Sequence, residues 1–369
     1  MKNKYHILIS GGGTGGHIFP AVSIANALKR RMDCEILFVG AEDRMEMERV
    51  PAAGYDIVGL PVAGFNRRNI FKNFAVIAKL AKSIRKAKSI VREFKPDIAI
   101  GVGGYASGPT LKVAQSMGVP TLLQEQNSYA GVTNKMLARK ADKICVAYDK
   151  MERFFPADKI VKTGNPVRMS LLSGNYDKVS ARESFGLNPT LPTLLVVGGS
   201  LGALTLNESM EKGLKRFADE GIQVIWQTGR SFVARSQAAA KGLRGVVVTP
   251  FISDMAAAYT AADLVVSRAG AGSISELELL AKPVILVPSP NVAEDHQTQN
   301  ALALSTRGAA VLVKDADARE SLVDTAINLI KDKNALDEMS ANILKLAMKD
   351  SDELIADEVV KLLEKRSKK

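Results

Sequence analysis

The residues best suited to chemistry stand in glycine-rich segments that follow short apolar runs. They are Gly11–His17, Gly103–Gly108 and Gly198–Gly202, and a fourth small-residue turn, Gly270–Ser273, precedes Glu276. A glycine loop that leads into a helix exposes backbone N–H groups, and these together with the helix dipole favour a phosphate. Glycine suits such a loop because a Cβ would block the close approach of an anion. One such loop is weak support, since many are plain tight turns. Several in one chain predict ligands that carry diphosphates.

Two side chains beside these segments are candidates for proton transfer. His17 ends the first glycine loop, and a neutral imidazole can accept a proton near pH 7. The alternative is that His17 only caps or braces its loop. Glu125, within the segment Gln124–Asn127, is the second candidate, and its alternative role is a structural ion pair.

The elements that position these loops are short apolar runs alternating with helical segments. In the first part of the chain the runs are His6–Ser10, Cys34–Gly40, Pro96–Gly104, Val119–Asn127 and Ala141–Tyr148. The pattern begins again at Thr193–Ala203 and continues through Gln223–Gly229, Gly245–Phe251, Ala262–Ser273 and Lys282–Pro290. Helices are predicted over Pro20–Arg31, over Leu206–Ala218 and from about residue 350 to the end. Short buried strands that alternate with helices predict an α/β fold with parallel sheets. The connector between the two similar halves is predicted near residues 165–175.

Composition is consistent with two globular domains in one chain. The 369 residues are 46% hydrophobic and 24% charged, and such a length exceeds one ordinary core. No apolar run reaches the ~18–20 residues that span a bilayer, and no signal peptide is recognisable, so we expect a cytoplasmic location. Cys34 and Cys145 lie in apolar segments and are predicted to be small core residues.

Two nucleotide-binding alternatives fit less well. Gly11, Gly13 and Gly16 match the G-x-G-x-x-G spacing of dinucleotide-binding domains. However, the second strand is not followed by an unambiguous Asp or Glu at the position that would bind the ribose. The sequence also shows no set of residues that would bind a nicotinamide ring. No Gly-Lys-Ser/Thr follows any loop, which argues against a P-loop hydrolase.

The order of the motifs resembles the MurG family of N-acetylglucosaminyltransferases, nearly from end to end. The segments that carry the resemblance are Gly11–Ala21, Gly103–Pro109, Gln124–Lys135, Gly164–Arg168, Gly198–Ala203, Phe251–Leu277 and Glu294–Ala301. The resemblance implies a GT-B fold, in which two Rossmann-like domains with parallel sheets face each other across a cleft. Residues 1–168, joined by a C-terminal helix at about 350–369, would form the acceptor- and membrane-binding domain. Residues 169–349 would bind UDP-N-acetylglucosamine.

The resemblance also implies roles for individual residues. Ser200 and Arg168 would lie by the donor diphosphate, the backbone of Ile252 would meet uracil, and Glu276 would accept hydrogen bonds from the ribose. The turn that approaches the sugar and phosphates would contain Ala271, Gly272, Ser273, Ile274 and Ser275, and Gln297 would contact N-acetylglucosamine. Thr14, Gly15, Gly16 and Asn127 would reach the donor from the first domain, and Gly104 and Tyr105 would flank the acceptor diphosphate.

The implied reaction transfers N-acetylglucosamine, with inversion, to the C4 hydroxyl of the lipid-diphosphate acceptor lipid I, giving lipid II. It needs a base near that hydroxyl and stabilisation of the UDP charge. No acidic pair stands in a metal-binding setting, so we expect no metal and no cofactor. A UDP-sugar 2-epimerase and a non-catalytic nucleotide-sugar-binding subunit remain alternatives. In a 2-epimerase we would expect several acidic residues and histidines clustered in the cleft, and no basic helix that binds a membrane.

The formal net charge of +11 is concentrated in one segment. Residues 64–95 contain ten Lys or Arg and one acid, and Ile70, Phe71, Phe74, Ile77, Ala81 and Ile84 recur there at helical spacing. A basic amphipathic helix is typical of a protein that lies on an anionic bilayer. Periodicity alone equally allows a core-facing helix with a solvated basic face, and the lipid-linked acceptor favours the membrane. Nucleic acid is not expected, because no aromatic platform is interleaved with the charges.

Overall fold

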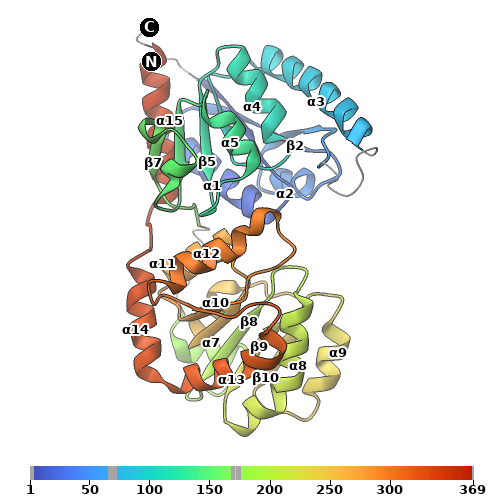
Figure 1. Ribbon diagram of the computed structural model, residues 1–369, viewed down its shortest axis with the longest axis vertical. Helices are drawn as coiled ribbons and strands as arrows, with labels where there is room; N and C mark the ends of the chain where they lie inside the picture. Colours follow the sequence, from blue (N-terminus) through green and yellow to red (C-terminus); the bar gives the residue numbers. More distant parts are fainter. Residues whose placement is uncertain (1–3, 65–72, 168–170, 172–175, 368–369) are drawn as a thin grey trace. The chain divides into compact units, whose positions relative to one another are not determined.

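The computed structural model describes residues 4–64, 73–167, 171 and 176–367. The chain divides into two compact units, unit 1 with Met1–Val167 and Met348–Lys369, and unit 2 with Arg168–Ala347. Each unit is built on a parallel β-sheet with helices packed on it (Figure 1). The predicted α/β class is therefore confirmed.

Unit 1 contains a seven-stranded sheet in the order β3-β2-β1-β4-β5-β6-β7. Its strands are β1 (Tyr5–Ser10), β2 (Cys34–Ala41), β3 (Asp56–Leu60), β4 (Ile98–Gly101), β5 (Thr121–Glu125), β6 (Lys143–Val146) and β7 (Ile160–Lys162). Its helices are α1 (Gly15–Arg31), α2 (Glu46–Ala52), α3 (Asn73–Phe94), α4 (Ser107–Ser116), α5 (Val132–Ala138) and α15 (Ser351–Ser367), with short 3₁₀ helices at Met151–Arg153 and Ala157–Lys159. The order reverses between β1 and β4, so the loops after these two strands lie at the switch point where such sheets bind ligands.

Both faces of this sheet are buried, which is why its strands read as continuous apolar runs. Ile7 and Ile9 of β1 belong to a core shared with α1 and α15, whereas Leu8 between them faces the core that includes residues of α3, α4 and α5. All three side chains are fully buried. The alternation follows from the two-residue period of a strand.

The C-terminal helix α15, red in Figure 1, belongs to unit 1 although it follows unit 2 in the sequence. Ile355, Val359 and Leu363 are buried in the core that contains α1. Arg30 and Arg31, at the end of α1, form ion pairs with Asp352, Glu353 and Asp357 of α15. The apolar contacts contribute more stability than these partly exposed ion pairs.

Helix α3 exposes part of its apolar surface. Val76, Ala87 and Ile90 face the core, whereas Ile77 and Ile84 are 55% and 40% exposed. The first residues of the amphipathic segment, 65–72, lie outside the described residues, as does the side chain of Phe74. In the described part of the chain, no helix combines the length and apolar character needed to cross a membrane.

Unit 2 contains a six-stranded sheet in the order β10-β9-β8-β11-β12-β13. Its strands are β8 (Thr193–Val197), β9 (Gln223–Gln227), β10 (Val246–Thr249), β11 (Leu264–Ser267), β12 (Val284–Leu286) and β13 (Val311–Leu312). Its helices are α7 (Lys178–Ser184), α8 (Leu204–Asp219), α9 (Val233–Ala240), α10 (Met255–Ala261), α11 (Ala271–Leu279), α12 (His296–Ser305), α13 (Ala318–Lys331) and α14 (Lys333–Leu344), with a 3₁₀ turn at Ala293–Asp295. Here the order reverses between β8 and β11. Trp226 and Phe217 are fully buried in the core on one face of this sheet.

The structure corrects two predicted helix starts. The first helix begins at Gly15 and not at Pro20, and α8 begins at Leu204 and not at Leu206. Because glycine disfavours a helix, the sequence indicates a loop over Gly11–His17 and a helix only after it. Pro20 instead lies inside α1, where it removes one helical hydrogen bond. The end of the first glycine segment is therefore the first turn of α1.

Replacement of Ile355 by alanine tests the contribution of α15 to unit 1. We expect Ile355→Ala to lower the free energy of unfolding by about 2–5 kcal/mol, because it leaves a cavity in a fully buried site. Urea denaturation and hydrogen exchange of the β1 amides measure the effect. The matched control is Leu354→Ala, at a site 38% exposed, with an expected loss below about 1 kcal/mol. Equal losses in the two variants would contradict the assignment of α15 to this core.

Candidate active site

In unit 1 the loops after β1 and β4 pack backbone against backbone. Gly13 and Gly104 both have a φ of +87°, a conformation that favours glycine. A Cβ on Gly104 would lie 2.4 Å from the carbonyl oxygen of Gly12, so a side chain there would force the loops apart. Tyr105, which follows this contact, is 58% exposed.

His17 lies in the first turn of α1, beside the loop after β4. Its Nδ1 is 3.0 Å from the carbonyl oxygen of Gly12 and 3.3 Å from the Thr14 hydroxyl. A Cβ on Gly103 would lie 2.9 Å from His17 Nε2, so Gly103 makes room for the ring. When Nδ1 donates to the Gly12 carbonyl, the neutral ring carries its basic lone pair on Nε2. This geometry is compatible with both roles predicted for His17, a general base and a structural support of its loop.

A buried carboxylate, which the sequence analysis missed, holds the first glycine loop. Glu46, the first residue of α2, is fully buried. It accepts hydrogen bonds from the amides of Gly13 at 2.9 Å and Ala41 at 3.0 Å. The Gly13 amide is thus already engaged. An anion at this loop would meet the amides of Gly15 and Gly16, which the start of a helix leaves without helical partners.

Glu125 is enclosed by its own loop. Its side chain is 2% exposed. One oxygen accepts from the backbone and side-chain nitrogens of Asn127, at 3.1 and 3.3 Å, and the other from the Gly131 amide and Asn134 Nδ2, at 3.0 and 2.9 Å. Burial raises the pKa of this carboxyl, and the four hydrogen bonds oppose that shift. The geometry is that of a group that fixes a loop.

The rest of the segment Gln124–Asn127 forms an internal network. Gln124 donates to Asn165 Oδ1 at 3.0 Å, Asn165 donates to the Gln126 carbonyl at 3.0 Å, and Gln126 donates to the Val102 carbonyl at 2.8 Å. These three side chains are buried, and Asn127 is half-buried. Of the four, Asn127 has the side chain best placed to meet a ligand.

In unit 2 the loops after β8 and β9 also meet backbone to backbone. A Cβ on Gly202 would lie 2.0 Å from the Thr228 carbonyl oxygen, and one on Gly229 would lie 2.1 Å from that of Leu201. Both glycines have positive φ, +79° and +76°. The contact leaves Ser200 exposed in the loop that leads into α8.

Gln227, at the end of β9, joins two of the predicted donor-binding segments. Its Nε2 donates to the Gly199 carbonyl at 2.9 Å, and its Oε1 accepts from the Ile252 amide at 2.8 Å. The side chain is 3% exposed. With its amide engaged in this way, Ile252 would offer a ligand its carbonyl. Sequence analysis missed this residue because a glutamine after an apolar strand carries no motif.

The turn after β11 is the beginning of α11, with Gly270 as the N-cap. Ala271, Ile274 and Ser275 are buried, so a ligand would meet mainly their backbone, while Gly272 and Ser273 are half-buried. A Cβ on Gly272 would have no atom within 4 Å, so there is open space at the helix start.

Glu276 and Gln297 each have a partner within unit 2. Glu276, in the second turn of α11, accepts a hydrogen bond from the Tyr259 hydroxyl at 3.1 Å. Gln297 accepts one from the Ser289 amide at 2.8 Å. Glu294 and Asp295, just before α12, have φ of +56° and +51°, which is uncommon outside glycine and typical of functional sites. Arg168 lies outside the described residues.

Comparisons with known proteins agree with this architecture. The glycosyltransferase family 28 N-terminal domain matches residues 7–146, and the C-terminal domain of that family matches residues 193–355. The crystal structure of MurG from Acinetobacter baumannii is 29% identical, with a TM-score of 0.79 over 97% of this chain and 99% of that one. A UDP-GlcNAc 2-epimerase from Neisseria meningitidis has a TM-score of 0.69 at 14% identity over 97% of this chain and 100% of that one, which indicates a shared fold only.

Curated relatives match over almost their whole length. Proteins from Phocaeicola vulgatus and Porphyromonas gingivalis are 61% and 56% identical, over 100% and 98% of this chain and 99% and 96% of the relatives. Both are named UDP-N-acetylglucosamine–N-acetylmuramyl-(pentapeptide) pyrophosphoryl-undecaprenol N-acetylglucosamine transferase. Fold and domains define a GT-B glycosyltransferase of family 28. Within that class, the chain belongs to the MurG family of these N-acetylglucosamine transferases.

The replacement Glu125→Gln tests whether this carboxylate holds its loop. We expect a loss of about 1–3 kcal/mol in the free energy of unfolding, because the new NH₂ group would face N–H donors where an oxygen now accepts. Urea denaturation measures the loss. The control is Glu93→Gln, whose exposed side chain accepts from Ser89 Oγ at 2.6 Å and can do so as an amide. If the two variants were equally stable, the bracing role would be wrong.

Proposed function

We propose that this chain transfers N-acetylglucosamine from UDP-N-acetylglucosamine to the C4 hydroxyl of the N-acetylmuramyl residue of lipid I. The product is lipid II, the precursor of peptidoglycan. The observation that carries the proposal is the 61% identity over the full chain to a transferase of that name. The glycine loops at the switch point of each sheet support it, because both substrates carry a diphosphate.

The reaction displaces UDP at the anomeric carbon. The C4 hydroxyl oxygen of the acceptor forms a bond to that carbon as the bond to the diphosphate oxygen breaks, and UDP leaves with the electron pair. The hydroxyl proton passes to a base, for which we propose His17 Nε2. The charge that develops on UDP is met by amides at the helix starts, as in other sites with oriented backbone donors, and by Arg168.

We assign the donor to unit 2 and the acceptor to unit 1. In unit 2, Ser200 and the amides at the start of α11 would hold the diphosphate, Glu276 the ribose, and Gln297 the sugar. Gln227 would position the Gly199 loop and Ile252 for the diphosphate and uracil. In unit 1, Gly15, Gly16, Gly104 and Tyr105 would flank the acceptor, with Asn127 held in place by Glu125.

A transfer assay with the purified full-length chain tests the proposal. Radiolabelled UDP-N-acetylglucosamine and a soluble lipid I analogue should give a labelled disaccharide product, and UDP-glucose and UDP-N-acetylgalactosamine should be poorer donors. Formation of UDP-N-acetylmannosamine without acceptor would indicate a 2-epimerase instead. Donor binding without any turnover would indicate a binding subunit.

Replacement of His17 separates a base from a brace. We expect His17→Ala to lower kcat by about 10²–10⁴-fold, the usual contribution of a general base, with little change in the Kd for UDP-N-acetylglucosamine. The control His17→Asn keeps a donor that can reach the Gly12 carbonyl but has no basic nitrogen, so its kcat should fall similarly. Near-normal turnover in the Asn variant would show that His17 stabilises its loop and is not the base.

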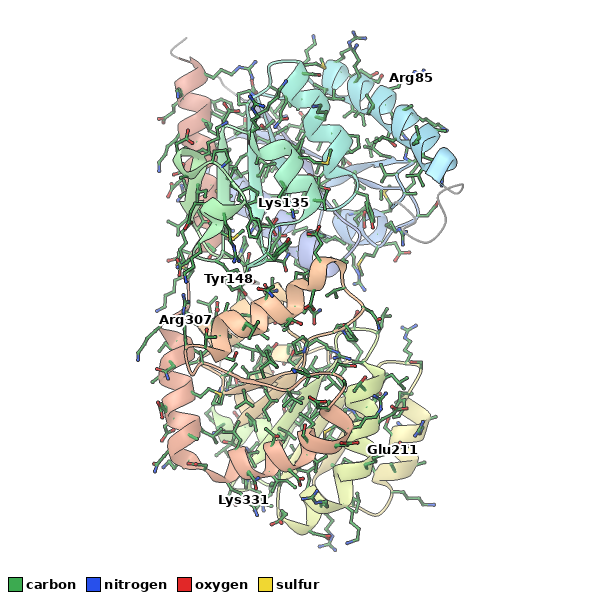
Figure 2. All side chains as sticks on the ribbon, in the orientation of Figure 1. Arg85, Lys135, Tyr148, Glu211, Arg307 and Lys331 are labelled. Carbon is green, nitrogen blue, oxygen red and sulfur yellow. The ribbon has the colours of Figure 1, made fainter. Side chains whose placement is uncertain are left out.

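We also propose that helix α3 attaches the protein to the cytoplasmic face of the membrane as a peripheral protein. Ile77, Ala81 and Ile84 are exposed on α3, among the exposed cations Lys79, Lys82, Arg85, Lys88 and Arg92. Arg85 points outward from the helix (Figure 2). Exposed apolar residues bordered by cations favour an anionic bilayer.

Binding to vesicles tests this attachment. The protein should bind vesicles that contain phosphatidylglycerol more tightly than pure phosphatidylcholine vesicles, and high salt should weaken the binding. We expect the double variant Lys82→Glu/Arg85→Glu to lose most of it, since each cation contributes about 1 kcal/mol near such a surface. The control Lys241→Glu/Arg244→Glu makes the same charge change at exposed sites of unit 2 and should bind like the wild type. Equal binding of all three proteins would refute the role of α3.

A further inference from the structure

A cavity at the opposite edge of the unit 2 sheet has no part in the site described above. Its volume is about 450 Å³, within the range of small-molecule sites. It is lined by residues at the amino ends of β8, β11 and β12, including Pro192, Asp263 and Pro283. The glycine loops of the candidate active site follow the carboxyl ends of the same sheet.

The lining has more positive than negative charge. Four cationic side chains and two acidic ones line it, and they are Lys178, Arg182, Lys282, Lys333, Asp263 and Asp337. Lys178 and Arg182 lie one helical turn apart on α7, and Lys333 and Asp337 one turn apart on α14. An excess of two positive charges in a concave site favours a dianion.

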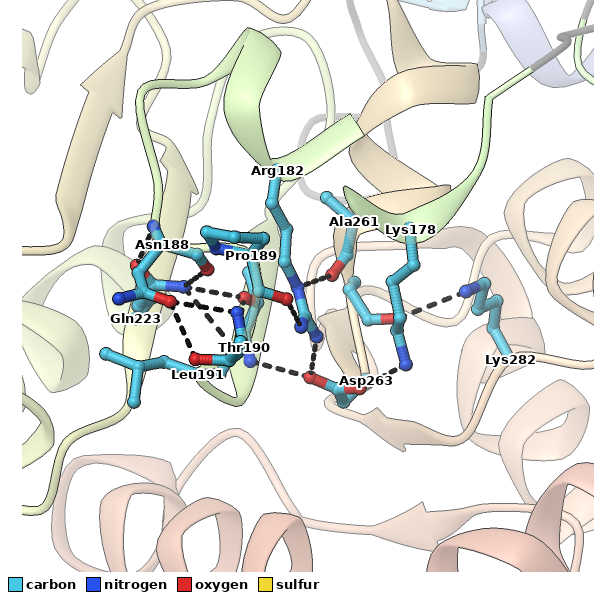
Figure 3. Close-up of polar contacts among 12 residues, drawn as sticks. Lys178, Arg182, Asn188, Pro189, Thr190, Leu191, Gln223, Ala261, Asp263 and Lys282 are labelled. Carbon is cyan, nitrogen blue, oxygen red and sulfur yellow. Dashed lines mark hydrogen bonds and ion pairs between the residues drawn. The ribbon is translucent and has the colours of Figure 1, made fainter. Parts of the chain in front are cut away.

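The acidic residue Asp263 is already paired with the two cations of α7. Asp263 accepts from Lys178 on one oxygen and from Arg182 at 2.5 Å and the Thr193 amide at 2.7 Å on the other. Figure 3 shows Lys178 and Arg182 converging on this carboxylate. Arg182 also donates to the carbonyls of Ala261 and Pro189, at 3.1 and 2.7 Å, so its side chain is held in place by the fold.

Two of the four cations, Lys282 and Lys333, form no ion pair in the described part of the chain, and Lys282 is the more buried of them. Its amine donates to the Ala262 carbonyl at 3.1 Å (Figure 3), and no carboxylate pairs with it in the described part of the chain. Burial, and then the nearby charge of Lys178, lower its pKa to about 8, although the charge of Asp263, with which it forms no ion pair, opposes this shift. A charged amine that is partly removed from water and lacks an anion is costly unless a ligand supplies one.

We propose that this cavity binds a small phosphate monoester, with the phosphate on Lys282 and Lys333. The apolar lining residues Ile330, Leu336 and Pro192 accept the organic part of the ligand, and Ser340 and Thr190 also line the cavity. The site is separate from the transfer reaction, so it can be occupied whether or not the chain turns over.

Calorimetric titration of the full-length protein with phenyl phosphate, and with inorganic phosphate for comparison, tests the site. Phenyl phosphate should bind more tightly than phosphate. Lys282→Met should weaken it about tenfold or more, because a charge-assisted contact is lost. This variant removes a partly buried charge and keeps most of the side-chain volume, so it should fold. Asp337→Asn should strengthen binding, and the exposed control Lys241→Met should leave it unchanged.

The pH dependence gives an independent readout. Lys282 has a lowered pKa in the free protein, and a bound dianion would raise it. Binding at about pH 9 should therefore take up a proton, and titrations in buffers of different ionisation enthalpy measure that uptake. Lys282→Met should abolish it.

Two results would overturn the proposal: phenyl phosphate that fails to bind, or binding with proton uptake that Lys282→Met leaves unchanged. Neither depends on transferase activity, so the proposed function can stand or fall separately. Vesicles of phosphatidylcholine with phosphatidic acid identify the source of the phosphate. If the vesicles compete with phenyl phosphate, and the competition requires Lys282, the site binds a lipid head group. If the vesicles do not compete, the site binds a soluble metabolite.

Discussion

The predicted ligand-binding loops of each unit depend on one steric constraint: two loops pass each other with their backbones in contact. In unit 1 a Cβ on Gly104 would meet the Gly12 carbonyl at 2.4 Å, and in unit 2 a Cβ on Gly202 would meet the Thr228 carbonyl at 2.0 Å. Because these approaches exclude any side chain, the loops turn sharply at the carboxyl edge of the sheet. The helices that follow, α1 and α8, begin at this edge, where their first amides have no helical partner. Glycine is needed here for packing between loops as much as for the approach of a phosphate.

Buried side chains decide which backbone groups remain for a ligand. Glu46 uses the amide of Gly13, Glu125 uses those of Asn127 and Gly131, and Gln227 uses that of Ile252. Each of these acceptors is at least 97% buried, so the bonds are protected from water and hold the loops firmly. The amides at the helix starts have no such partner by the nature of a helix end. The same segments thus contain amides that fix the loop and amides that can bind an anion.

The architecture could be predicted from the sequence because it depends on local patterns. Buried parallel strands read as apolar runs, and glycine loops mark the switch points, so the sequence predicts the loops after β1, β4, β8 and β11 and the central strands of both sheets. It does not predict β3, β7 and β13, which lie at the edges of the sheets. Nor does it predict the first turn of α1, because Gly15 and Gly16 are residues typical of a loop. Glu46 and Gln227 were missed for a different reason: their roles arise from contacts with loops distant in the sequence. Glu46 is 33 residues from Gly13, and Gln227 is 28 residues from Gly199. The assignment of His17 and the membrane helix stays a prediction.

Cations of this chain lie in two different environments, on the exposed surface of α3 and inside the cavity of unit 2. On α3 the cations are exposed, so water screens them and they can act together on an extended anionic surface at little cost to the fold. Lys282 is held within a cavity, where its lowered pKa reflects burial and the charge of Lys178. A desolvated lysine destabilises the native state while it is charged, and that cost disappears as the pH rises above the ordinary pKa of lysine. A protein retains such a lysine at a cost to stability, which is reasonable where a compact anion compensates it. The net charge of +11 therefore points to two kinds of anionic partner. An extended membrane surface favours exposed lysines, whereas a small anion favours a partly buried one.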